Sequence, residues 1–112
     1  MRSFFQGDVI WMDFNPQAGH EQAGRRPALV VSTSKFNATG ALTMVCPITH
    51  SKTRQVIRPI LPEGMGVTGC VLCDHARFLD LSARNASFAE KAPADLTQSV
   101  LDILQVLIAP DA

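Results

Sequence analysis

The chain has 112 residues, of which 46% are hydrophobic and 18% charged, so it can bury a core and leaves no room for two ordinary domains. Ten basic and ten acidic residues give a formal net charge of zero. This balance argues against a general nucleic-acid coat protein but is compatible with a local basic groove, because one stretch of the chain contains Arg25, Arg26, Lys52, Arg54 and Arg58.

The first half of the chain predicts two strands and a short helical turn. Val9–Phe14 is rich in strand formers and ends at the turn signal Asn15-Pro16. A polar loop over residues 17–27 follows, and the apolar run Ala28–Ser32 then predicts a buried strand. Ser34–Gly40 predicts one helical turn followed by a bend.

The middle of the chain predicts four more strands separated by polar loops and turns. Pro47 cannot donate to a ladder, so we expect it at an edge or a bulge. Pro62–Gly66 forms a turn cluster, and residues 49–54 form a polar loop. The predicted strands are Leu42–Ile48, Gln55–Leu61, Gly69–Asp74 and Arg77–Leu79.

The C-terminal region predicts a helix. Pro93 suits the first helical position and Asp95 the first turn, and the helix should end before Pro110. Apolar residues then recur at three- and four-residue spacing, which forms one stripe that we expect to pack on the barrel. The stripe consists of Leu96, Val100, Ile103, Leu104 and Leu107. Short strands with one terminal helix predict a mainly β fold, a small SH3-like β-barrel with a C-terminal α-helix, in a single domain over residues 1–112.

The location of the protein is predicted from what the sequence lacks. The N-terminal residues contain no long apolar stretch of the kind that secretion needs, and no run approaches the roughly 18 apolar residues of a membrane span. Cys46, Cys70 and Cys73 form an odd set. We therefore expect a cytoplasmic protein with reduced thiols.

Groups capable of chemistry are concentrated in the loop between the first two strands. Cleavage of RNA by the neighbouring 2′-hydroxyl needs a base, an acid and a cation for the pentacovalent phosphate, but no metal. Glu21 could take the proton, with His20 as a competing base, and the Arg26 guanidinium could hold two phosphate oxygens. On composition alone, however, a Glu and an Arg in one loop are more often a surface ion pair.

Metal binding and cofactors are not expected. Cys70 and Cys73 match a C-x-x-C spacing, but residues three apart on a strand point to opposite faces, and no second pair completes a zinc site. No spacing supports a ligand set formed by the three histidines. Lys52 and Arg54 suit backbone phosphates, although a solvated loop explains them equally well.

Several blocks of the sequence resemble the MazF/PemK toxin family. Gly19–Val30, preceded by Gly7–Trp11 and Asp13–Pro16, is similar to the N-terminal signature of that family. Its later blocks resemble Pro47–Thr49, Gly69–His75 and Leu79–Arg84, in the same order. The resemblance runs from about Gly7 to the terminal helix.

The resemblance implies a barrel like that of the gyrase poison CcdB and a metal-independent endoribonuclease that works as a homodimer. It would cut single-stranded RNA, either mRNA or rRNA, at specific sequences, leave 2′,3′-cyclic phosphate and 5′-hydroxyl ends, and arrest translation and growth. A cognate MazE/PemI-like antitoxin would occupy the RNA groove. Operator DNA would be contacted only by the toxin–antitoxin complex.

The resemblance also assigns roles to residues. The catalytic roles fall on Glu21 and Arg26, with Thr49 at the scissile phosphate and His20 and Asp74 as supporting or alternative groups. Residues expected to bind RNA are Gln22, Arg25, His50, Lys52, Arg54, His75 and Arg77. PemK-type members carry an arginine where this chain has Leu72, so a proton-transfer scheme that uses it does not transfer. His75 stands where a glutamine is usual, which could change base contacts.

Two other functions are compatible with the same fold. One is a non-enzymatic, CcdB-like gyrase poison, which would need no Glu21/Arg26 pair. The other is a DNA-binding regulatory module, which the neutral charge disfavours. Growth arrest that survives Glu21→Ala and Arg26→Ala would favour the poison, and operator binding by the protein alone would favour the regulator.

Overall fold

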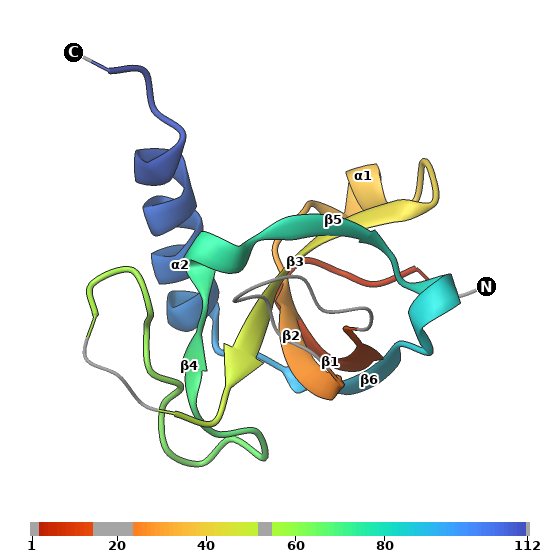
Figure 1. Cartoon of the computed structure of the whole chain (residues 1–112), viewed down its shortest axis with the longest axis horizontal. Helices are drawn as coiled ribbons and strands as arrows, with labels where there is room; N and C mark the ends of the chain where they lie inside the picture. The colour runs from red at the N-terminus through yellow and green to blue at the C-terminus, as the bar shows by residue number, and fades with distance from the viewer. Residues whose placement is uncertain (1–2, 15–23, 52–54, 112) are drawn as a thin grey trace.

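The computed structural model describes residues 3–14, 24–51 and 55–111 (Figure 1). In these ranges the chain forms a six-stranded antiparallel sheet in the order β4-β3-β2-β1-β6, with β5 pairing with another part of β3. The strands are β1 Asp8–Asp13, β2 Arg25–Val30, β3 Leu42–Thr49, β4 Cys70–Val71, β5 Arg77–Asp80 and β6 Ser87–Lys91. The helices are α1 Ser34–Asn37 and α2 Ala94–Leu107, with the short 3-10 turns η1 Cys73–His75 and η2 Ser82–Arg84.

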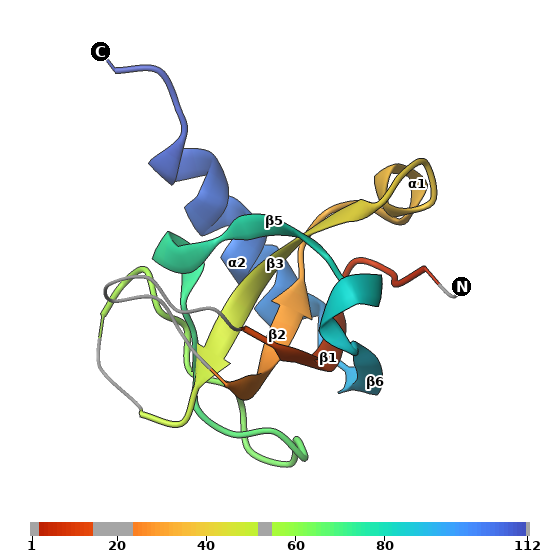
Figure 2. The same ribbon diagram turned by 45° about the vertical axis from the view of Figure 1, so that its right-hand side comes forward.

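The sheet curls into a half-barrel because one segment crosses from one side to the other. This segment, residues 77–91, will be called the strap. Its first part, β5, pairs with the start of β3, and its last part, β6, pairs with β1. Figures 1 and 2 show the strap passing over the central strands, whereas α2 packs behind them. The mainly β architecture with a C-terminal helix is therefore confirmed.

Alternate residues of the central strands pack on opposite faces of the sheet, as the pleat requires. On one face they meet α2, and on the other they meet the strap. The helix-side cluster includes Val9, Leu29, Cys46, Leu96 and Val100, all buried. The strap-side cluster includes Ile10, Met12, Ala28, Val30 and Leu79, all buried. The half-barrel thus has apolar contacts on both faces, and polar side chains are left at its ends and rims.

The terminal helix follows its predicted stripe only in its first turns. Leu96 and Val100 are buried, while Ile103 and Leu104 are partly buried against the helix-side cluster. Leu107 is 46% exposed, so the stripe continues beyond the sheet. In the described part of the chain, no helix is long and apolar enough to cross a membrane.

The strand predicted over Gln55–Leu61 is wrong. The described residues form a turn in which the Arg58 amide donates to the Gln55 carbonyl at 3.0 Å, and only an isolated bridge joins Ile60 to Cys70. Pro59 has no amide hydrogen to donate, although its carbonyl accepts from the Val71 amide at 2.9 Å. The segment therefore lies against β4 without forming a ladder.

The ends of two other strands differ from the prediction, and one further strand was not predicted. β2 begins at Arg25 rather than Ala28, and the strand predicted over Gly69–Asp74 narrows to β4 because Cys73 starts η1. β6 was not predicted at all. Its residues are half-exposed, including Phe88 at 43%, so no continuous apolar run marks it.

Pro47 was expected at an edge or a bulge, but β3 is paired on both sides. The residue lies between the part of β3 that pairs with β5, which ends at Val45, and the part that pairs with β4, which starts at Ile48. Its carbonyl accepts from the Leu72 amide at 2.8 Å. The missing amide hydrogen thus falls in the gap between two ladders, where a proline removes no ladder bond.

Candidate active site

Two of the predicted site residues lie on one face, at the same end of the sheet. Ala28 of β2 pairs with Pro47 of β3, and Arg26 and Thr49 each lie two residues beyond this pair, toward the same end of the sheet. Paired residues in antiparallel strands point to the same face, so both side chains extend the strap-side row of Ala28. Both are partly exposed.

Arg77 points to the same face from the strap. It pairs with Val45, a member of the strap-side cluster, and Leu79 continues the same row. Arg77 is partly buried. His50, by contrast, follows β3 and is exposed. The face that carries Arg26 and Thr49 therefore presents a second guanidinium, further back along β3.

Five of the predicted residues lie outside the described part of the chain. They are His20, Glu21, Gln22, Lys52 and Arg54. The described residues that flank the first of these segments are hydrogen-bonded to each other, with the Phe14 amide donating to the Gly24 carbonyl at 2.9 Å. The described residues on either side of this segment, Phe14 and Gly24, therefore lie at the end of the sheet where Arg26 lies.

Gly69 determines how closely the chain approaches Thr49. It adopts a φ of +125°, which residues with a side chain rarely accept. A Cβ atom at this position would lie 1.7 Å from the Thr49 carbonyl oxygen. Only glycine can therefore occupy this position, and it holds β4 against the residue at the end of β3.

Asp74 is held by an arginine from a segment that the sequence did not connect with it. Arg58 donates hydrogen bonds to both carboxylate oxygens, with its Nε 3.2 Å from Oδ1 and its Nη2 2.9 Å from Oδ2. The His75 Nε2 lies 3.9 Å from the same Oδ2. These hydrogen bonds with Arg58 keep the pKa of Asp74 below its usual value of 3.8. The carboxylate is therefore ionised at neutral pH and suited to accept a hydrogen bond.

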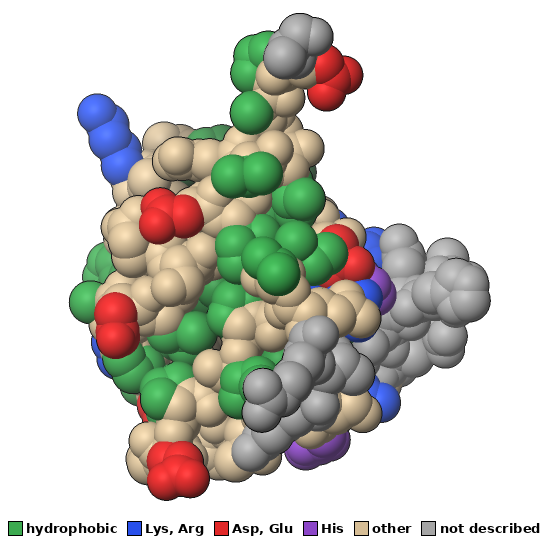
Figure 3. Space-filling view, turned by 90° about the vertical axis from the view of Figure 1, so that its left-hand side faces the viewer, with side chains coloured by type: hydrophobic (Ala, Val, Ile, Leu, Met, Phe, Trp, Pro, Cys, Tyr) green, Lys and Arg blue, Asp and Glu red, His purple; other side chains and the backbone are tan. Residues whose placement is uncertain are grey.

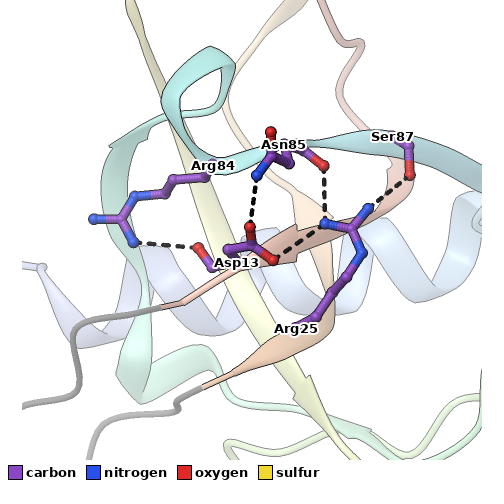
Figure 4. A network of polar contacts seen from close by, with 5 residues as sticks. All are labelled: Asp13, Arg25, Arg84, Asn85 and Ser87. Carbon is purple, nitrogen blue, oxygen red and sulfur yellow. Dashed lines mark hydrogen bonds and ion pairs between the residues drawn. The ribbon is translucent and has the colours of Figure 1, made fainter.

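Arg25 points away from Arg26, as neighbours on a strand must. Figure 4 shows its guanidinium bonded to Asp13 at 3.2 Å, to the Asn85 carbonyl at 2.9 Å and to the Ser87 hydroxyl at 3.2 Å. The Asn85 amide and the Arg84 guanidinium also bond to Asp13. Arg25 therefore fastens β2 and β1 to the strap, and 44% of its side chain remains exposed at the rim.

The cysteines contribute no reactive thiol. Cys46, Cys70 and Cys73 are all free and buried. Burial raises the pKa of the Cys73 thiol to about 11, and it raises that of Cys46 further. Within the described ranges, no group of three or more His, Cys, Asp or Glu residues is placed to hold a metal ion.

The sequence did not reveal three of these features. Arg58 was noted only as one of several basic residues, and Gly69 only as the start of a strand. The interaction of Arg25 with the strap depends on β6, which was not predicted. A basic residue in an otherwise irregular loop was the one available signal for Arg58, and it did not indicate the partner.

The chain is similar to known proteins in both sequence and structure. A profile described as the PemK-like, MazF-like toxin of type II toxin–antitoxin systems matches residues 5–108. The endoribonuclease toxin ChpB of Escherichia coli K12 is 36% identical over 110 residues, which cover 94% of each chain. Endoribonuclease PemK of Escherichia coli is 33% identical over 107 residues, which cover 92% of this chain and 80% of PemK.

Solved structures give the same result. MazF from Deinococcus radiodurans superposes with a TM-score of 0.92 at 40% identity, covering 98% of this chain and 100% of MazF. A MazE–MazF structure from the same organism gives a TM-score of 0.86 at 40% identity, covering 99% of this chain and 100% of the matched chain.

Proposed function

Because the chain belongs to the family of PemK-like, MazF-like toxins of type II toxin–antitoxin systems, we propose that it is an endoribonuclease that cuts single-stranded RNA at specific sequences. The observation that supports this most directly is that Arg26 and Thr49 lie on one face at the same end of the sheet. A guanidinium and a hydroxyl on one face suit a phosphodiester, since both can donate to its oxygens.

The proposed reaction is an attack by the 2′-oxygen on the adjacent phosphorus. Glu21, or His20 in its place, removes the 2′-proton, and the 2′-oxygen forms a bond to phosphorus. Arg26 stabilises the negative charge of the pentacovalent phosphate, while Thr49 donates to a phosphate oxygen. The bond from phosphorus to the 5′-oxygen then breaks, and that oxygen takes a proton from the protonated base. The products carry a 2′,3′-cyclic phosphate and a 5′-hydroxyl.

This mechanism requires no metal, because the nucleophile belongs to the substrate and the charge is met by arginine. Asp74, ionised and held by Arg58, would support the site as a hydrogen-bond acceptor for the substrate, since its lowered pKa makes it a weak base. The remaining polar residues would bind the RNA chain and its bases. They are Gln22, Arg25, His50, Lys52, Arg54, His75 and Arg77.

We further propose that the protein acts in the cytoplasm on mRNA, or on rRNA, and thereby arrests translation. Its partners would be a second copy of the chain and a MazE/PemI-like antitoxin that occupies the RNA groove. The MazE–MazF structure of Deinococcus radiodurans supports the antitoxin, since its toxin chain shares this fold at 40% identity. Operator DNA would be bound only by the complex of toxin and antitoxin.

The experiment is to incubate the purified protein with a long RNA in EDTA and to map the cut sites and the end groups. Cleavage should occur at a few sequences, and Glu21→Gln and Arg26→Lys should each slow it by about a hundredfold or more. Glu63→Gln, in an exposed turn, is the matched control and should cut like the wild type. A folded, antitoxin-free sample that leaves RNA intact would contradict the proposal.

A further inference from the structure

A cavity of about 600 Å³ opens between the N-terminal segment, the end of α1 and the strap. Its volume lies within the range of small-molecule sites, roughly 300–1,000 Å³. In Figures 1 and 2 the cyan turn at the end of β5 lies beside the N-terminus. The catalytic roles proposed for Arg26 and Thr49 make no use of this cavity, since neither residue lines it.

The lining of the cavity is uncharged and combines apolar with polar residues. Phe4, Leu81 and Ala86 contribute apolar surface. None of the described residues that line it carries a charged side chain. A phosphate or a carboxylate bound inside would therefore lack a countercharge, which makes an anionic ligand unfavourable there.

Thr43 contributes a hydroxyl group to this cavity. The residue is 6% exposed, and within the described part of the chain its hydroxyl makes no hydrogen bond. This hydroxyl can therefore donate one hydrogen bond to a ligand in the cavity and accept another.

Two residues of the strap complete a polar edge. Asn85 uses its side-chain nitrogen on Asp13 and its carbonyl on Arg25, so within the described residues its side-chain oxygen remains an available acceptor. The Ser87 hydroxyl accepts from Arg25 and can still donate its own hydrogen. The cavity thus offers donors and acceptors along one edge and apolar surface around it.

We propose that this cavity binds a nucleobase. A base is flat, neutral and apolar on its faces, and its edge carries both donors and acceptors, which matches the lining. The Arg25 guanidinium, held by Asn85 and Ser87 and 44% exposed in its side chain, lies beside the cavity where it could meet a phosphate attached to that base.

The base could belong to a free nucleoside or to a single-stranded RNA bound across the protein. The idea that the base belongs to a bound RNA rests on the proposed function, whereas the idea that the cavity accepts a base does not. The two sources are separated by titrating the protein with each of the four nucleosides and with a single-stranded 2′-O-methyl RNA. This RNA cannot be cleaved because its 2′-oxygens are blocked, so the measurement reports binding even if the protein is no nuclease.

Binding is followed by NMR shifts of the Thr43 and Ala86 amides. Thr43→Val keeps the shape and removes the hydroxyl, so it should weaken binding by about fivefold, the value of one neutral hydrogen bond. Gly40→Leu should also weaken binding, because it adds a large side chain at a lining residue where a Cβ meets nothing within 4 Å. Thr68→Val, at an exposed position outside the cavity, should bind like the wild type.

Saturable shifts with one nucleoside would support a site for the free base, and shifts with the RNA alone would support a base subsite along the RNA path. In both cases the two cavity variants must weaken binding. The proposal is overturned if neither ligand perturbs these amides, or if Thr43→Val binds as tightly as the wild type. If Gly40→Leu does not fold, Thr43→Val decides by itself.

Discussion

At the scale of single residues, the chemistry depends on which face of the sheet a side chain occupies. Arg25 and Arg26 are neighbours in sequence, but the pleat sends them to opposite faces. Arg25 forms an ion pair with Asp13 at the rim, while Arg26 lies on the same face as Thr49. Asp74 gains its role from Arg58, 16 positions earlier in the chain. The two neighbouring arginines therefore have different roles.

Thr49 should contribute a hydrogen bond to the charged phosphate. Thr49→Val, which keeps the shape, is expected to lower kcat by about 10- to 100-fold, because a hydrogen bond to a charged group contributes about 1.5–3 kcal/mol. Thr49→Ser should retain most of the activity. Initial rates on a short fluorogenic RNA measure both, with Thr68→Val as the control. Full activity of Thr49→Val would remove this residue from the mechanism.

The pair formed by Arg58 and Asp74 should make stability depend on pH. The pKa of Asp74 is lowered in the folded protein, so its stabilising contribution is complete above its usual value of 3.8 and is lost as the pH falls through the lowered pKa. Asp74→Asn should therefore lower the free energy of unfolding by about 1 kcal/mol at neutral pH.

The difference in the free energy of unfolding between Asp74→Asn and the wild type should shrink towards zero in strongly acidic solution, where the wild-type carboxyl is also neutral. Urea unfolding at neutral and acidic pH measures it, and Asp111→Asn in the exposed tail serves as the control. If this difference in the free energy of unfolding is the same at both pH values, the ion pair does not cause it.

The buried cysteines should resist alkylation. Burial raises the pKa of Cys73 to about 11, and thiolate is the reactive form, so iodoacetamide should label the native protein far more slowly than the urea-unfolded chain. Mass spectrometry of timed samples follows the reaction. Rapid labelling of the native protein would contradict the packing of β4 and η1 against β3.

At the scale of elements, the site depends on how short segments are held together. β4 has only two residues, and its place beside Thr49 depends on Gly69. The strap closes the half-barrel through β6 and through the Arg25 network. Glu90 of β6 also accepts from the Gly66 and Val67 amides, at 3.2 and 2.9 Å, which ties the turn before β4 to the strap.

Gly69→Ala should damage the site without touching a catalytic group. The new Cβ would collide with the Thr49 carbonyl and the backbone would be strained, so we expect a loss of about 2 kcal/mol or more in stability. Activity should fall with it, because Thr49 would shift. Gly40→Ala meets open space and should remain within about 0.5 kcal/mol of the wild type. Thermal unfolding and RNA cleavage, measured side by side, test the pair.

At the scale of the whole molecule, the exposed apolar residues favour self-association. Val106 is 76% and Ile108 82% exposed at the end of α2, and Figure 3 shows hydrophobic side chains gathered on the side where this helix lies. Patches of this kind on a small protein commonly mark an interface. The proposed homodimer would cover such a patch and supplement the core of a small domain.

Light scattering should therefore give a mass of twice 12.1 kDa at micromolar concentration. The double variant Val106→Asp, Ile108→Asp should weaken the dimer by about a hundredfold or more, since two charges would enter an apolar contact. Gln105→Asp adds a charge on the same exposed turn and controls for changes in the helix. A wild-type protein that stays monomeric at all concentrations would contradict the dimer.

The sequence alone determined the family resemblance, the strands β1 and β3 with small errors in their ends, and the terminal helix. These features are local, because a motif is contiguous and the periodicity of an apolar pattern can be read in a window of a dozen residues. Glu21 and Arg26 were proposed as a pair for the same reason, since one loop contains both.

Only the tertiary structure decided the rest. The strand β6 is recognisable only because it pairs with β1. The role of Arg58 follows from its hydrogen bond to Asp74, and the role of Gly69 follows from its close approach to Thr49. The cavity beneath Thr43 is formed by three segments that are far apart in the chain. Contacts of this kind depend on backbone proximity between distant positions, and that proximity leaves no pattern in the order of neighbouring residues.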